Sequence, residues 1–167
     1  MACSLRLVLL TAQRPGEVLG MRRDDLDGMW WTLRAGATKS SRTHRVPLSP
    51  VAQHVLSIAL SASRGIAAPV YVFPSPRGDG PVRWLSHASA RIRRRIPDVP
   101  HWTPHDLRRT AATHMAQLGV SRFIIGRILN HADPSVTSVY ERHDYDAEKA
   151  EALGAWGERV GQILTAD

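Results

Sequence analysis

Two side chains able to bind an anion, His105 and Arg108, stand three residues apart directly after Thr103-Pro104. Thr103 is a preferred helix cap and Pro104 a preferred first helical residue, so the pair is predicted to lie in a first helical turn. A helix N-terminus presents unpaired backbone N–H groups and the positive end of the helix dipole. This turn therefore predicts a binding site for an anion such as phosphate.

The same stretch continues with His131 and, nine positions later, Tyr140. The predicted helix carries an apolar stripe and ends at a glycine, a second helix begins at Ser121, and a short amphipathic segment over 135–140 ends in the phenol. Each residue also has an ordinary alternative role. A single histidine at a helix start is usually a cap or surface residue, and a single tyrosine usually packs half-buried. The stripe consists of Leu107, Ala111, Met115 and Leu118.

Upstream, Arg14 precedes Pro15, which predicts a break in the chain followed by a new helix. Two short strands are expected over 30–33 and 43–48, with a polar turn between them that carries Lys39. Taken alone, an arginine at a break is often a surface residue, and a lysine in a turn is usually solvated.

Taken together, these motifs resemble the tyrosine recombinase or phage integrase family. The pattern consists of H-x-x-R, then L-x-H, then a tyrosine nine residues beyond, preceded by T-G-x-R-x-x-E and a strand of the type R-x-V-P-L. In this chain Ala12 replaces the glycine of T-G-x-R, and Glu17 is the acidic residue of that motif. The resemblance implies an α+β fold, mostly helical with a small antiparallel sheet, which is the catalytic core of DNA breaking-rejoining enzymes.

The resemblance also implies the role of each residue. Tyr140 would attack a DNA phosphodiester and form a 3′-phosphotyrosine, while Arg14 and Arg108 would bind the non-bridging oxygens. Lys39 would protonate the leaving 5′-oxygen, with His105 assisting proton transfer and His131 hydrogen-bonding the phosphate. Glu17 is expected to orient Arg14 or a neighbouring side chain. No cofactor and no metal are expected.

The charge of the chain favours a polyanionic partner. The 167 residues carry a formal net charge of +7, and twenty arginines stand beside only two lysines, Lys39 and Lys149. We expect double-stranded DNA as the partner. Codon bias in a GC-rich genome is the ordinary explanation for the arginines, and a run of them usually forms a solvated face. The residues expected to touch the phosphate backbone are Arg42, Arg45, Arg93, Arg94 and Arg95.

The ends of the chain bear on its organisation. The apolar run SLRLVLLTA contains Arg6 and has no basic residues before it, so a helix packed by Leu5, Val8 and Leu9 is predicted rather than a signal peptide. Residues 1–167 are expected to form one catalytic domain, with the N-terminal core-binding domain of full-length recombinases absent. A last helix over 147–167 follows, with Leu153, Trp156, Val160 and Ile163 on its apolar side. The sequence leaves open whether it packs on its own domain or on a neighbour.

We therefore expect a site-specific recombinase domain, mainly monomeric when isolated and assembling into a tetrameric synapse on DNA in the full-length form. We expect it to be cytoplasmic and associated with the nucleoid, not with a membrane. A topoisomerase-like enzyme using the same chemistry is a close variant. The alternative from another class is a DNA-binding module, or a truncated recombinase remnant without activity.

Overall fold

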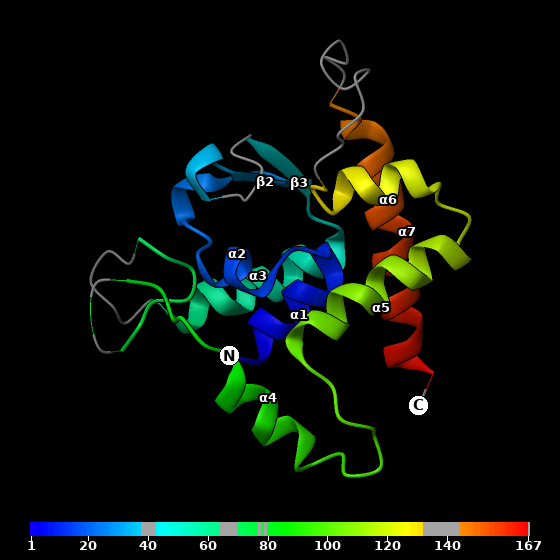
Figure 1. Ribbon diagram of the computed structural model, residues 1–167. Coiled ribbons are helices and arrows are strands. Elements are labelled where there is room, and N and C mark those ends of the chain that lie inside the picture. Colours follow the sequence, from blue (N-terminus) through cyan, green and yellow to red (C-terminus); the bar gives the residue numbers. More distant parts are fainter. Residues whose placement is uncertain (38–42, 64–69, 77, 79, 132–143, 167) are drawn as a thin grey trace.

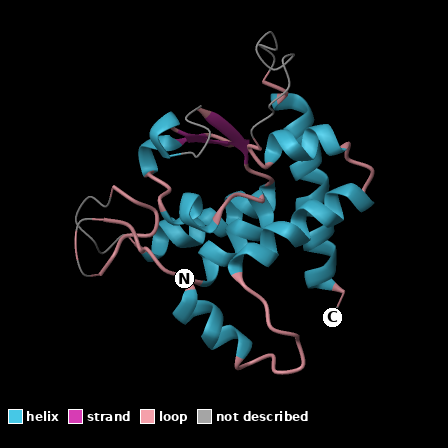
Figure 2. Ribbon diagram, viewed as in Figure 1, coloured by secondary structure: helices cyan, strands magenta, loops and turns pink. Residues whose placement is uncertain are grey.

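The computed structural model describes residues 1–37, 43–63, 70–76, 78, 80–131 and 144–166. It is mostly helical with a small antiparallel sheet, as the sequence predicted (Figures 1 and 2). The helices are α1 (Ala2–Thr11), α2 (Pro15–Leu19), α3 (Pro50–Ala62), α4 (Ser86–Arg93), α5 (Pro104–Gln117), α6 (Arg122–Ile128) and α7 (Asp146–Thr165), and short 3-10 turns, η1 and η2, lie at Arg23–Asp25 and Ala35–Ala37.

Helix α1 is the centre of the molecule. It packs against α2, α3, α5 and α7, and its apolar residues are distributed around the helix rather than along one stripe. Leu7 and Val8 are fully buried, Leu5 is nearly so, and Leu9 is partly buried against the core. A helix that is apolar on all sides is stable only when other elements enclose it. The predicted helix is thus confirmed, and its surroundings fix the position of the chain segment that follows it.

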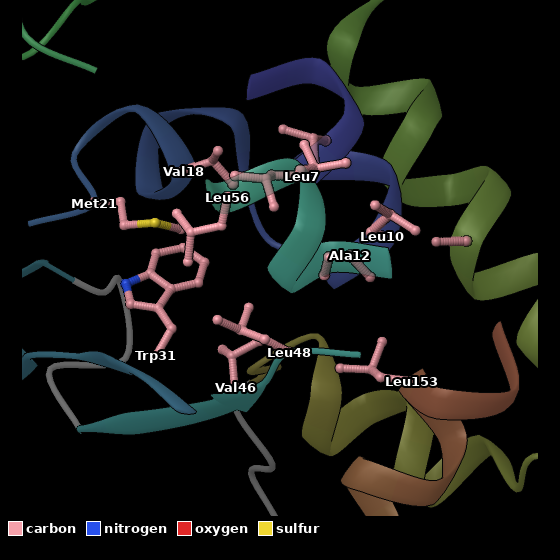
Figure 3. Packing of buried hydrophobic residues seen from close by; sticks show 14 of the residues in the cluster. Leu7, Leu10, Ala12, Val18, Met21, Trp31, Val46, Leu48, Leu56 and Leu153 are labelled. Carbon is pink, nitrogen blue, oxygen red and sulfur yellow. The ribbon is translucent and has the colours of Figure 1, made fainter. Parts of the chain in front are cut away.

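The sheet contains the three strands β1 (Leu26–Asp27), β2 (Trp30–Leu33) and β3 (His44–Pro47), antiparallel and in that order. The predicted hairpin is confirmed, and β1 is an additional short edge strand. Trp31 pairs with Val46, and both side chains are buried. Figure 3 shows them directed toward residues of α1, α2 and α3. The sheet therefore has one face on the core.

Helix α7 packs on its own domain, which settles for this structure the question that the sequence left open. Trp156 is buried, donates its Nε1–H to the Leu9 carbonyl of α1 at 2.8 Å, and stacks on His114 with ring centroids 5.4 Å apart. At Gly157 an added Cβ would lie 2.5 Å from Ser49 Oγ and 2.8 Å from Ser49 Cβ. Only glycine permits α7 to approach the start of α3 this closely.

Two residues assigned to apolar stripes from the sequence are exposed instead. Leu118 is 45% exposed because α5 ends at Gln117 and Leu118 occupies the C-cap, where the helical periodicity no longer applies. Ile163 is 48% exposed because it lies in the last turn of α7, at the end of the surface that the domain covers. No helix in the described ranges is long and apolar enough to cross a lipid bilayer.

Candidate active site

The candidate site is built where α1 and α6 end. Ala12 caps α1 with a left-handed φ of 55°, and Asn130 follows α6 with a φ of 47°. At α6 the N–H of Asn130 bonds the Arg127 carbonyl at 3.1 Å, and the N–H of His131 bonds the Gly126 carbonyl at 3.1 Å. This pair of bonds is the Schellman ending of a helix. The chain turns sharply at both places, so Arg14 follows closely after the end of α1 and His131 after the end of α6.

The buried Arg108 joins these two helix ends. It lies in α5 and is 7% exposed. Its Nη1 donates to the Ala12 carbonyl and its Nη2 to the Leu129 carbonyl, each at 2.6 Å. The last carbonyls of a helix have no partner within the helix, so a guanidinium fork is well suited to them. Arg108 is therefore held rigidly by residues far from it in the sequence.

Arg14 is held by Glu17, as the sequence predicted. Arg14 Nη1 lies 2.8 Å from Glu17 Oε1, and the backbone N–H of Arg14 donates to Glu17 Oε2 at 2.8 Å. The Glu17 carboxylate is buried whereas the Arg14 side chain is 24% exposed. The carboxylate thus fixes Arg14 at the start of α2 and leaves part of the guanidinium open to solvent.

The two guanidinium groups lie close enough to repel each other. Burial, and then the charge of Arg14, lower the pKa of Arg108 to about 10, while Glu17 opposes this shift. A pKa of about 10 still leaves Arg108 charged at neutral pH. Of the described acidic side chains, Glu17 is the one that acts on Arg108, so two cations share one carboxylate here. Such an excess of positive charge favours the binding of an anion.

His131 faces the same two arginines. Partial burial lowers its pKa below the ordinary histidine value, and the charges of Arg108 and Arg14 lower it further. The imidazole is therefore neutral at pH 7, with one nitrogen as a donor and the other as an acceptor. The structure thus brings Arg14, Arg108 and His131 together from three separate parts of the chain.

His105 lies in the first turn of α5, exposed and one turn before Arg108. A capping box is present at the start of α5: the N–H and the hydroxyl of Thr103 both donate to Asp106 Oδ2, at 2.9 and 2.7 Å. These bonds from Thr103 lower the pKa of Asp106, and the hydrogen bond and charge of Arg109 lower it further. The start of α5 is therefore well fixed, with His105 open to solvent.

Three predicted residues, Lys39, Arg42 and Tyr140, lie outside the described residues. The nearby Tyr145 is described, and it packs against its own domain. It is half-buried as the N-cap of α7, and its ring meets Phe123 edge-on at 5.0 Å. The guanidinium of Arg127 lies 5.4 Å from the centre of the Tyr145 ring.

The arginines predicted to bind DNA differ in their surroundings. Arg45 contacts Asp146 through Nη1 and lies over the Trp30 ring, 4.3 Å from its centre. Arg93 is half-buried and donates to the Trp102 carbonyl at 2.8 Å. Arg94 and Arg95 are exposed just after α4. In Figure 1, α4 lies on the other side of α1 and α3 from the sheet, so these arginines do not belong to the site around Arg108.

Three buried polar residues near the site were missed by sequence reasoning: Gln13, His44 and Lys149. His44 lies on the same face of β3 as the buried Val46, so the alternation of this strand could have predicted that His44 is buried. Lys149 precedes the buried Leu153 by four positions in α7, so the helical period contained it too.

Lys149 links α7 to the sheet. Its Nζ donates to the Arg45 carbonyl at 2.9 Å and lies 2.8 Å from Asp146 Oδ1. Strand β3 and the start of α7 are therefore fastened to each other. In the described part of the chain no group of three metal-binding side chains is placed to hold an ion.

Comparison with known proteins agrees with this arrangement. A model of the phage integrase family matches residues 1–147, a range that includes every predicted site residue. The chain belongs to the phage integrase family. Prophage integrase IntF of Escherichia coli (strain K12) is 28% identical over 158 residues, which cover 93% of this chain and 32% of IntF. Tyrosine recombinase XerC of Methylobacterium sp. (strain 4-46) is 31% identical over 167 residues, which cover 97% of this chain and 51% of XerC.

Solved structures show the same fold. The crystal structure of XerA recombinase matches with a TM-score of 0.62 at 23% identity, covering 96% of this chain and 55% of XerA. XerH site-specific recombinase bound to its difH substrate also matches with a TM-score of 0.62, at 17% identity, covering 98% of this chain and 46% of XerH. At these identities the likeness establishes the fold alone. The chain spans about a third to a half of the length of the two curated relatives named above.

Proposed function

We propose that residues 1–167 are the catalytic domain of a tyrosine recombinase that cuts and rejoins double-stranded DNA. The observation that carries this proposal is the pair of guanidinium groups, Arg14 and Arg108, which repel each other beside a neutral His131. Two cations that share the single carboxylate of Glu17 leave an excess of positive charge, which favours the binding of a further anion. A scissile phosphate, whose transition state carries more negative charge than its ground state, is such an anion.

The reaction then follows from the residues. The phenol of Tyr140 gives up its proton to solvent as its oxygen attacks the phosphorus, the bond from phosphorus to the 5′-oxygen breaks, and the DNA 3′-end remains joined to the enzyme as a phosphotyrosine. Lys39 supplies the proton that the departing 5′-oxygen takes up, and His105 assists this transfer. Attack by a 5′-hydroxyl reverses these bond changes and rejoins the strand. Because the phosphotyrosine ester retains the energy of the broken bond, the proposal requires neither a metal nor a nucleotide.

The proposal includes DNA as the partner, with a tetrameric synapse in a longer form and action at the nucleoid. The names of the neighbours support DNA: XerH was solved on its difH substrate, and the Tn1549 transposon integrase with DNA. We propose that the isolated chain is mainly monomeric, and the burial of Leu153, Trp156 and Val160 against its own domain supports this. The exposed Arg94 and Arg95 would add phosphate contacts that depend strongly on salt.

Covalent capture tests the proposal. A pool of duplexes with randomised flanks, each nicked so that the short 5′-hydroxyl strand diffuses away after cleavage, is incubated with the protein and denatured in detergent. We expect a DNA adduct that survives denaturation, is abolished by Tyr140→Phe and is retained by Tyr145→Phe. Sequencing of the captured DNA then gives the preferred site.

Two outcomes would contradict the proposal. An adduct that persists in Tyr140→Phe but disappears in Tyr145→Phe would show that Tyr145, and not Tyr140, is the nucleophile. DNA binding by the wild-type protein without any adduct on the pool would favour a binding module without catalysis.

A further inference from the structure

The residue directly before Arg14 is a glutamine that the structure encloses completely. Gln13 is 0% exposed, and its Nε2 donates two hydrogen bonds of 2.8 Å, one to the Thr11 carbonyl and one to the Ile128 carbonyl. Its Oε1 is buried and has no hydrogen-bond partner among the described residues. Burying an amide costs free energy unless it is hydrogen-bonded. The buried Gln13 side chain is tolerated because both N–H donors of Nε2 are hydrogen-bonded.

The two carbonyls that Gln13 joins are the last of α1 and α6. Arg108 joins the next carbonyl of each helix, at Ala12 and Leu129. Gln13 and Arg108 therefore form two consecutive cross-links between the same two helix ends. His44 adds a third donor, with its Nε2 at 3.1 Å from the Ile128 carbonyl. Arg14 follows the first helix end and His131 the second, so the cross-links set the spacing of the two groups.

We propose that Gln13 is a positioning residue for strand cleavage, an inference that rests on the proposed function. By holding the end of α1 to the end of α6, it keeps Arg14 and His131 at the separation that a phosphate requires. If the two bonds from Gln13 Nε2 are removed, Arg108 alone cross-links the two helix ends, and it must also face the phosphate. A displacement of about 1 Å in such a group costs up to about 10²-fold in rate.

The variant that tests this is Gln13→Met, which keeps the length and burial of the side chain and removes both donors. The matched control is Gln53→Met in α3, where Gln53 Nε2 also donates to a backbone carbonyl, that of Leu48, at 2.8 Å. For each protein, the rate constant of adduct formation is measured in a single turnover at saturating protein, on the nicked duplex that wild-type protein captures best. The dissociation constant for the uncut duplex and the folded fraction are measured beside it.

We expect Gln13→Met to lower the rate constant of the folded protein by between about 10-fold and 100-fold. We expect its dissociation constant for DNA to stay within about twofold of wild type, because uniform binding and transition-state stabilisation are separable in this way. Gln53→Met should match wild type in both quantities. If Gln13→Met does not fold, Gln13→Asn takes its place, since it keeps the amide but is too short to reach both carbonyls, and the same loss of rate is expected.

A structural role alone would lower the folded fraction and leave the rate constant of the folded protein unchanged, and that result would overturn the inference. An equal loss in Gln53→Met would overturn it as well. Absence of an adduct with the wild-type protein would instead refute the proposed function, so the two failures are distinguishable.

Discussion

Acidification should destabilise this protein through one buried histidine. His44 is 8% exposed and bonds the Ile128 carbonyl. Burial lowers the pKa of His44 to about 4, and the charges of Lys149 and Arg108 act in the same direction. The hydrogen bond to Ile128 and the charge of Asp146 raise the pKa and only partly compensate. His44 is therefore neutral in the folded protein under conditions in which it would be protonated in the unfolded chain.

The sign and size of the effect follow from linkage. Above pH 6.5 the histidine is neutral in both states, and the full stability is present. As the pH falls from 6.5 toward 4, the unfolded chain takes up a proton that the folded protein refuses, so stability is lost by about 1.4 kcal/mol per pH unit. By pH 4.5 the loss due to His44 is roughly 2.5 kcal/mol, and below pH 4 it grows no further.

Urea unfolding of wild type and His44→Gln between pH 7.5 and 4.5 measures this loss. Glutamine retains a donor for the Ile128 carbonyl but does not titrate, so the difference between the two proteins isolates the histidine from the carboxylates. We expect the free energy of unfolding of His44→Gln to rise relative to wild type by roughly 2.5 kcal/mol over this range. His54→Gln is the control, because that side chain is exposed on α3. A relative change in His44→Gln no larger than that of the control would refute the reasoning.

Further predictions concern the general acid, the link from α7 to the sheet, and the docking of α7. Lys39→Ala should regain cleavage on a substrate whose 5′-bridging oxygen is replaced by sulfur, since a thiolate leaves without a proton. Arg108→Ala should not regain cleavage on that substrate. If Lys39→Ala loses equal activity on both substrates, Lys39 is not the general acid. Lys149→Met should lower the free energy of unfolding by about 2–3 kcal/mol in urea titrations, because it leaves the Asp146 carboxylate with one cation fewer, and an unchanged midpoint would contradict this. Gly157→Ala should destabilise the protein by about 1–3 kcal/mol through overpacking. Gly154→Ala in the same helix should stabilise the protein by up to about 1 kcal/mol, because nothing lies within 4 Å of the added Cβ. Thermal melts compare the two variants, and equal effects would argue against the observed docking of α7.

The sequence predicted well those elements whose signals are local. Capping residues located the starts of α5 and α6, and the proline after Arg14 located α2. Alternation located the hairpin, and helical periodicity located α7. Where the local signal ended, as at Leu118 and Ile163, the predicted burial was wrong, because periodicity does not show where a helix stops contacting its neighbours.

The cross-links of the site could not be predicted in this way. Nothing near Gln13 in the sequence indicates that its partner carbonyl belongs to Ile128, and nothing near Arg108 indicates Ala12. Motif spacing identified Arg14 and Arg108 as members of one site, but it did not reveal that Arg108 also joins two helix ends. The substitution of alanine for the motif glycine at position 12 also gains a physical meaning only from the structure, since its φ of 55° is a conformation that glycine adopts without strain.

The long sequence separation of these contacts bears on how the chain folds during its synthesis. Arg108 bonds a carbonyl 96 positions before it, Gln13 one 115 positions after it, and Trp156 one 147 positions before it. During synthesis the N-terminus of the chain emerges first, so these bonds at the end of α1 can form only after most of the remaining sequence has been made. An unfinished chain already carries most of its arginines, but it lacks the ordered arrangement of Arg14, Arg108 and His131. Under the proposed function, strand cleavage therefore becomes possible only after most of residues 1–167 have been translated.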